Sequence, residues 1–170
     1  AYSAREVVEK AKGFASDFVA SPKLDGLACS LKYDANGYLE LASTRGDGQR
    51  GDDITANVRY IQAIPKHIQA SNVEIRGEVY MPLSSFKNFD DAVSPRNLAV
   101  GGLKQKDPAE TAKYGLSFFG YELLGETHQT EMEKLARIQS LGFQAVEHRL
   151  IVRPANDAKF NVMSLSSDER

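Results

Sequence analysis

An alternation of apolar and polar residues that leads into a tight-turn dipeptide constrains the fold of this chain most strongly. The alternate positions of residues 27–33 are apolar, which indicates a strand with one buried face. Asn36-Gly37 follows, a dipeptide that accepts the positive φ angles of a type I′ turn. We therefore predict a hairpin that returns along residues 38–44 and brings Arg45 back toward Lys23.

Other local patterns predict further strands and two helices. We expect strands over residues 75–81, 116–124 and 150–152, a helix over 4–12 and a helix that begins at a capping box at 130–133 and ends at Gly142. Residues 156–170 are polar and are expected to fray.

The strand expected over residues 75–81 presents one apolar and one polar face. Ile75 and Val79 lie on the apolar face, and Arg76, Glu78 and Tyr80 are expected on the exposed face. Glu78 is therefore expected to point toward a site rather than into the core.

Composition limits the class of protein. With 170 residues and 42% hydrophobic content, the chain can bury one core, as a single domain or a lobe of one. A net charge of −2 gives no global attraction for nucleic acid, so DNA binding would need a local cationic face. Cys29 is the single cysteine, which excludes an internal disulfide and a cysteine-cluster zinc site, and its expected role is core packing. No stretch has the length of a membrane span or the pattern of a signal peptide, so we expect a soluble, cytoplasmic protein.

Lys23-Leu24-Asp25-Gly26 is the segment that most clearly indicates a catalytic role. A lysine at a strand end, followed at once by a turn, can serve as a covalent nucleophile. Its ammonium, with an ordinary pKa of about 10.4, must be partly desolvated or placed beside cations before it can react at neutral pH. The alternative interpretation is a solvated turn without chemistry.

Five blocks follow one another along the chain, at residues 23–26, 43–53, 73–82, 94–97 and 118–121. Their residues and order resemble those of a known family, the nucleotidyltransferase (adenylation) domains of bacterial NAD⁺-dependent DNA ligases. The similarity extends from about Val7 to about Val152. The resemblance implies an α+β nucleotidyltransferase (ATP-grasp-like) fold with mainly antiparallel sheets flanked by helices.

The resemblance also implies a reaction. Lys23 would attack the α-phosphorus of NAD⁺, expel nicotinamide mononucleotide and hold AMP covalently. The AMP would pass to the 5′-phosphate at a nick in double-stranded DNA, and the neighbouring 3′-hydroxyl would then displace it, with Mg²⁺ offsetting charge. Asp25 would position the lysine, and Gly26 would allow close backbone approach, unless it is a plain turn residue.

Four other residues are assigned to the nucleotide by the same resemblance. Arg45 would meet ribose and phosphate, with a solvated loop arginine as the alternative. Glu78 would meet the ribose hydroxyl and the divalent metal, with a surface salt bridge to Arg76 as the alternative. Tyr121 would stack on adenine, with a buried core tyrosine as the alternative, and Arg96 would lie near the nucleotide.

A second group is expected to contact DNA. Arg96 and Lys104 would lie near the DNA 5′-phosphate, and Lys104 stands where the family usually has an arginine, so it lacks the bidentate fork. Arg50, Asn57 and Arg59 are expected to cap the loop or to meet DNA phosphates.

The chain departs from the family in three ways. Ser21 stands where the family usually has a glutamate that recognises adenine. The helical domain that binds nicotinamide mononucleotide does not precede the match, and two later blocks that each supply a phosphate-binding lysine do not follow it. We therefore expect residues 1–170 to be an adenylation domain whose carboxy-terminal part is missing, either a fragment or a shortened relative.

Two other functions remain open on the sequence. One is a catalytically inactive relative that binds nucleotide or DNA, and the other is an adenylating or capping enzyme that acts on RNA or protein. The blocks around Arg45 and Glu78 favour the DNA ligase branch over the second alternative.

Overall fold

The computed structural model describes residues 17–46, 50–89, 94–146 and 149–152. Its elements are β1 (Asp17–Ala20), β2 (Leu27–Tyr33), β3 (Leu39–Thr44), α2 (Thr55–Val58), β4 (Val73–Tyr80), α3 (Leu83–Phe86), α4 (Pro95–Leu103), the 3₁₀ helix η1 (Pro108–Tyr114), β5 (Ser117–Leu124), α5 (Glu131–Ser140), β6 (Gln144–Ala145) and β7 (Arg149–Val152). The helix predicted over 4–12 and the frayed end predicted over 156–170 lie outside the described residues.

The chain divides into two units. One unit comprises residues 23–146, and the other comprises 1–22 together with 147–170. In the described part of the second unit, β1 pairs antiparallel with β7, with Val19 opposite Leu150.

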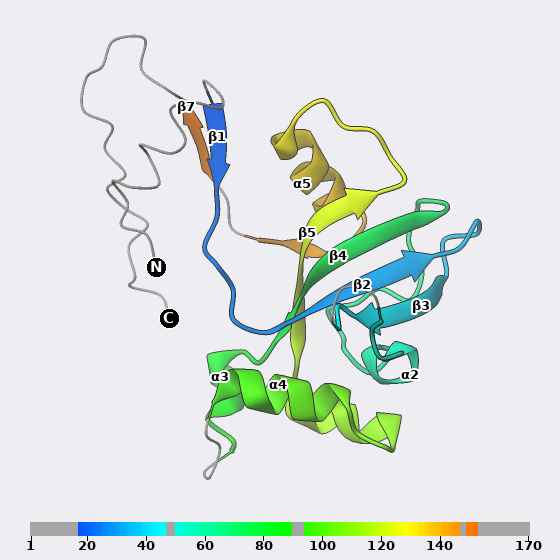
Figure 1. Ribbon diagram of the computed structural model, residues 1–170, viewed down its shortest axis with the longest axis vertical. Helices are drawn as coiled ribbons and strands as arrows, with labels where there is room; N and C mark the ends of the chain where they lie inside the picture. The colour runs from blue at the N-terminus through cyan, green and yellow to red at the C-terminus, as the bar shows by residue number, and fades with distance from the viewer. Residues whose placement is uncertain (1–16, 47–49, 90–93, 147–148, 153–170) are drawn as a thin grey trace. The chain divides into compact units, whose positions relative to one another are not determined.

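The larger unit is built on a five-stranded sheet with the order β3-β2-β4-β5-β6 (Figure 1). The first three pairings are antiparallel, and only β5 with β6 is parallel. This arrangement confirms the prediction of a mixed α+β fold with a mainly antiparallel sheet.

One face of the sheet forms the core, because the apolar positions of the strands alternate as the sequence predicted. Leu31 and Ile75 are fully buried and stand opposite each other on β2 and β4. α5 packs against β5 so closely that a Cβ on Gly120 would lie 2.8 Å from a methyl carbon of Ile138. The opposite face carries Glu78 and Phe119, which also stand opposite each other and are only half-buried.

The connection between β2 and β3 differs from the predicted type I′ turn. Gly37 has a φ of 79°, but Asn36 does not have a positive φ. The Asp34 carboxylate accepts hydrogen bonds from the backbone N–H groups of Asn36 at 2.8 Å and Tyr38 at 2.9 Å. Because aspartate bonds its own downstream backbone in this way, the loop is longer and needs a left-handed residue only at Gly37.

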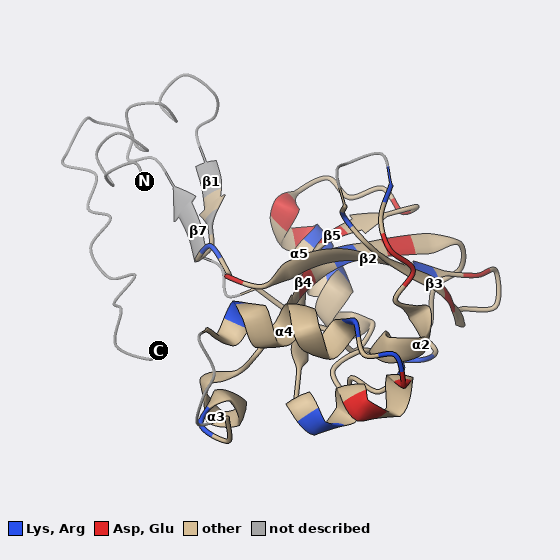
Figure 2. Cartoon of the chain, turned by 60° about the horizontal axis from the view of Figure 1, so that its bottom comes forward, with Lys and Arg blue, Asp and Glu red and all other residues tan. Residues whose placement is uncertain are grey.

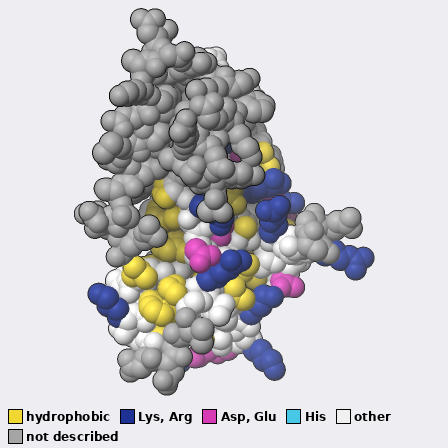
Figure 3. Space-filling model, turned by 60° about the vertical axis from the view of Figure 1, so that its left-hand side comes forward, with side chains coloured by type: hydrophobic (Ala, Val, Ile, Leu, Met, Phe, Trp, Pro, Cys, Tyr) yellow, Lys and Arg dark blue, Asp and Glu magenta, His cyan; other side chains and the backbone are white. Residues whose placement is uncertain are grey.

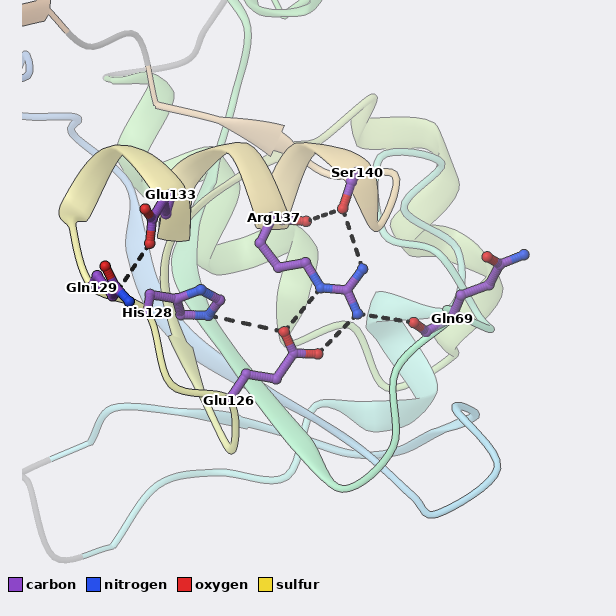
Figure 4. Close-up of polar contacts among 7 residues, drawn as sticks. All are labelled: Gln69, Glu126, His128, Gln129, Glu133, Arg137 and Ser140. Atoms are coloured by element: carbon purple, nitrogen blue, oxygen red, sulfur yellow. Dashed lines mark hydrogen bonds and ion pairs between the residues drawn. The ribbon is translucent and has the colours of Figure 1, made fainter.

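Helix α5 forms as predicted. The side chain of Thr130 accepts a hydrogen bond from the Glu133 N–H at 3.1 Å and caps the helix. Farther along, Arg137 donates to both carboxylate oxygens of Glu126 at 2.9 Å and to the Gln69 carbonyl at 3.1 Å (Figure 4). This cluster joins α5 to the β5–α5 connection and to the segment before β4.

The sequence did not predict the helices between β3 and β5. A buried polar network holds α2, α4 and η1 together, in which the Asn57 side chain donates to the Gln105 carbonyl and to Thr111 Oγ1, each at 3.0 Å. Thr111 donates in turn to the Gly102 carbonyl at 2.8 Å. The side chain of Asn57 is thus buried and bonded inside the protein, and the prediction that it meets DNA phosphates is wrong.

None of the helices in the described residues is long and apolar enough to cross a membrane.

Candidate active site

The predicted nucleophile lies at the entry to the sheet. Lys23 is exposed and stands four residues before β2, and the last residue of its turn, Gly26, is buried. The N–H of Gly26 donates a hydrogen bond to Glu78 Oε1 on β4 at 3.1 Å. A Cβ at Gly26 would lie 2.2 Å from the Val79 carbonyl oxygen, so only glycine fits there without displacing backbone.

Helix α4 approaches the same turn with its first residues. The hydroxyl of Ser94 accepts a hydrogen bond from the Asn97 N–H at 3.2 Å and caps the helix, and Pro95 is its first residue. In the first turn, Arg96 Nη1 lies 3.3 Å from Asp25 Oδ1. Both side chains are exposed, and such pairs stabilise a fold by at most about 1 kcal/mol, so this pair mainly orients the two groups.

Glu78 lies between charges of both signs. Burial raises the pKa of its carboxyl above the ordinary value, and the negative charge of Asp25 adds to this. The Gly26 N–H, Lys23 and Arg96 act in the opposite direction on the same pKa. These effects place the turn and the two cations in one electrostatic neighbourhood.

Glu78 lies on the face of β4 opposite the core, as predicted, but its side chain is half-buried, because it reaches over the end of the β2–β4 ladder to Gly26. The alternative of a salt bridge with Arg76 is wrong, since Arg76 Nε pairs with Glu74 Oε1 at 2.7 Å.

Tyr121 lies on β5, next to the strand that carries Glu78, and Arg45 directly follows β3. The Arg45 N–H donates to the Ala28 carbonyl at 3.0 Å, which confirms that the hairpin returns Arg45 to the start of β2. Tyr121 is 37% exposed, so the alternative of a buried core tyrosine is wrong. Its pKa is raised by partial burial and by the negative charge of Glu78, while Arg45 opposes the shift.

Charged side chains of both signs lie close together on this part of the molecule. Figure 3 shows basic and acidic side chains beside hydrophobic ones on one face, and Figure 2 shows basic residues at both ends of α4. At the second end, Lys104 Nζ lies 2.7 Å from Asp52 Oδ2. Asp52 is fixed on the backbone, because its N–H donates to Thr44 Oγ1 at 2.9 Å and its carbonyl accepts from the Thr44 N–H at 3.0 Å.

The predicted DNA contacts are dispersed. Arg50 is exposed on the loop after β3. The guanidinium of Arg59 lies 3.5 Å from the Leu39 carbonyl oxygen, at the end of the β2–β3 hairpin opposite Arg45. The structure therefore does not bring Arg59 together with the residues around Lys23.

The sequence reasoning missed an aromatic pair beside Glu78. The rings of Tyr80 and Phe119 are stacked with centroids 4.7 Å apart and an angle of 10° between their planes. Phe119 stands opposite Glu78 in the sheet. The alternation along residues 117–124 could have identified Phe119 as a residue of the open face.

The described residues contain no group of three or more His, Cys, Asp and Glu side chains that could hold a metal ion. Mg²⁺ is commonly bound by one or two carboxylates together with substrate phosphates and water. Glu78 is a half-buried carboxylate, and in its ionised form it is chemically suited to be one such ligand. As a whole, the arrangement offers a lysine amine, cations for phosphate oxygens and an exposed aromatic ring.

Comparisons with known proteins agree with this chemistry. The model of the NAD-dependent DNA ligase adenylation domain family matches residues 2–168. A DNA ligase of Shouchella clausii is 42% identical over 153 residues, which cover 82% of this chain and 23% of the relative. A DNA ligase of Roseiflexus sp. is 41% identical over 157 residues, 74% of this chain and 22% of the relative. One of Magnetococcus marinus is 48% identical over 118 residues, 62% of this chain and 15% of the relative. The chain thus spans less than a quarter of the length of these relatives.

Proposed function

Because this chain belongs to the NAD-dependent DNA ligase adenylation domains, we propose that it carries the lysine that takes AMP from NAD⁺. The observation that carries the proposal is the convergence of β4 and α4 on one turn. Gly26 is bonded to Glu78 of β4 and Asp25 is paired with Arg96 of α4, so the Lys23 turn lies beside the positive charge of Arg96.

The first step is a nucleophilic substitution at phosphorus. The neutral amine of Lys23 attacks the α-phosphorus of NAD⁺, a P–N bond forms, and the P–O bond to the nicotinamide mononucleotide phosphate breaks. The amine loses a proton, and nicotinamide mononucleotide leaves with the electron pair of the broken bond. The product is AMP linked to Lys23 through a phosphoramidate.

The neighbouring side chains have distinct roles in this proposal. Asp25 and Arg96 orient the turn, and Arg45 binds ribose and phosphate with its planar fork of donors. The exposed ring of Tyr121 provides a stacking surface for adenine. Glu78 meets the ribose hydroxyl and is the residue that would hold Mg²⁺, which would offset negative charge on the phosphate oxygens.

The later steps belong to a complete ligase. An oxygen of the 5′-phosphate at a DNA nick attacks the AMP phosphorus and the P–N bond breaks. The 3′-hydroxyl then attacks the activated 5′-phosphate and AMP leaves. Arg50, Arg59, Arg96 and Lys104 are the proposed contacts to nicked double-stranded DNA, and the proposed setting is an ATP-grasp-like nucleotidyltransferase fold in the cytoplasm.

An intact-mass assay tests the proposal. The chain is incubated with NAD⁺ and Mg²⁺, and we expect a mass increase of one adenylate in the unmodified chain. Lys23→Ala should remove the increase. The matched control is Lys32→Ala, an exposed lysine on β2 that should leave it intact.

The same samples decide between an enzyme and a binding module. Calorimetric titration with AMP measures binding without chemistry. AMP binding with no adenylate in the unmodified chain would favour the catalytically inactive relative, and the absence of both would refute a nucleotide site.

A further inference from the structure

The contact between Glu78 and Gly26 closes the end of the β2–β4 ladder. The ladder begins with Leu27 opposite Val79, so Gly26 is the first residue outside it. The acceptor for its N–H is the Glu78 side chain, 52 residues away in the sequence, at 3.1 Å. A carboxylate from β4 thus extends the hydrogen bonding of the sheet by one residue.

The backbone around Gly26 is packed so closely that the position of the turn depends on this contact. Gly26 is buried, and its Cα lies so close to β4 that a Cβ would stand 2.2 Å from the Val79 carbonyl oxygen and 3.0 Å from Glu78 Cγ. A buried N–H that loses its acceptor destabilises the folded conformation, because water cannot replace the bond. Removal of the Glu78 carboxylate should therefore release the turn from β4.

We infer that Glu78 is a positioning residue for Lys23, which acts through the Gly26 backbone N–H in addition to any contact with the nucleotide. Lys23 and Gly26 are the two ends of one turn, and among the described residues the Asp25 side chain between them is held by the exposed pair with Arg96. The bond at Gly26 is the more protected of the two attachments. This inference rests on the proposed function of Lys23 as the residue that takes AMP.

Two substitutions separate positioning from direct contact. Glu78→Ala removes the acceptor, whereas Glu78→Gln keeps a carbonyl oxygen that can accept the Gly26 N–H but loses the charge. Glu74→Gln is the matched control, since Glu74 lies on the same face of β4 and pairs with Arg76 instead of Gly26.

The first measurement uses the 170-residue chain without nucleotide and follows backbone amides by NMR. We expect the Gly26 amide of Glu78→Ala to exchange with solvent at least about tenfold faster than in the unmodified chain. In Glu78→Gln and Glu74→Gln, its exchange should stay within about threefold of the unmodified chain. The Lys23 amide signal should move in Glu78→Ala and keep its position in Glu78→Gln. Unchanged Gly26 exchange or an unmoved Lys23 signal in Glu78→Ala would overturn the inference.

The second measurement is the rate of adenylate formation on Lys23 with NAD⁺ and Mg²⁺. Positioning predicts that Glu78→Gln reacts about tenfold faster than Glu78→Ala. If Glu78→Gln protects Gly26 but reacts no faster than Glu78→Ala, Glu78 acts by contact alone and the inference is wrong. If the unmodified chain forms no adenylate, the proposed function fails, and the Gly26 exchange and Lys23 signal by themselves decide whether Glu78 holds the turn.

Discussion

Glu78 shows how one side chain can connect folding with charge at a site. Its carboxylate is half-buried, and its environment raises its pKa above the ordinary value of 4.5, chiefly through burial and then through the charge of Asp25. The hydrogen bond from Gly26 and the positive charges of Lys23 and Arg96 limit the shift. The protonation state of Glu78 is therefore sensitive to whatever charge a ligand brings to the site.

This shift predicts a pH dependence of stability. Because the folded-state pKa is higher than the unfolded one, the folded chain binds more protons between the two values. The contribution of the Glu78 pKa shift to the free energy of unfolding is thus fully present below about pH 4.5 and is lost as the pH rises through the folded-state pKa. Urea unfolding of the unmodified chain and Glu78→Gln across this range should show a steeper loss of stability with rising pH in the unmodified chain. Parallel pH profiles would contradict the prediction.

Cys29 provides a separate test of the core at the residue scale. Its side chain is 3% exposed, and burial, with a smaller effect of the charge of Glu78, raises the pKa of the thiol to about 12. Because the thiolate is the reactive form, we expect no reaction with a thiol reagent at about pH 8 in the folded chain. Labelling should be complete in guanidinium chloride, which is the control, and rapid labelling of the folded chain would show that this part of the core is open.

At the scale of secondary structure, Arg45 and Arg59 lie at opposite ends of the β2–β3 hairpin. Arg45 lies beside the start of β2, whereas Arg59 contacts the Leu39 carbonyl at the other end of the hairpin. Arg45→Ala should weaken AMP binding by about tenfold or more through the loss of charge-assisted hydrogen bonds. Arg59→Ala should leave it within about twofold, since exposed charges beyond the Debye length are screened. Calorimetric titration measures the AMP affinity of both variants. Equal losses of affinity would mean that Arg45 and Arg59 do not differ in their contribution to AMP binding.

The strands could be predicted from sequence because a strand with one buried face has alternating apolar and polar residues. The hairpin and the return of Arg45 to the start of β2 followed from that pattern. The turn type was wrong because the Asp34 side chain, rather than Asn36-Gly37, determines the hydrogen bonds of the loop. The four-residue helices α2 and α3 span about one turn, which is too short to show an apolar period.

The sequence proposed the residues of the candidate site but only part of the contacts between them. The pairing of β2 with β4 brings Gly26 to Glu78 across 52 residues, and no local pattern encodes that register. For the same reason, the sequence could not predict that Glu78 is half-buried, and it left a salt bridge with Arg76 open as an alternative. Long-range contacts of this kind depend on the assembled sheet.

At the scale of the whole molecule, this chain spans 15% to 23% of the length of the DNA ligases it matches. A single electrostatic stabiliser typically contributes about 100-fold to 1,000-fold in rate, and positioning of both substrates contributes further. We therefore predict that the 170 residues alone do not seal a nicked duplex with NAD⁺ and Mg²⁺ in a gel assay that includes a complete ligase as the positive control. Multiple turnovers by the isolated chain would contradict this prediction.

The central claim is that Lys23 is the residue that becomes joined to AMP. Peptide mapping by tandem mass spectrometry at neutral pH, after incubation of the chain with NAD⁺ and Mg²⁺, tests it most directly. We expect adenylate on the peptide that contains Lys23 and fragment ions that assign it to that side chain. Adenylate on Lys32 or Lys104, with Lys23 unmodified, would show that Lys23 is not the nucleophile.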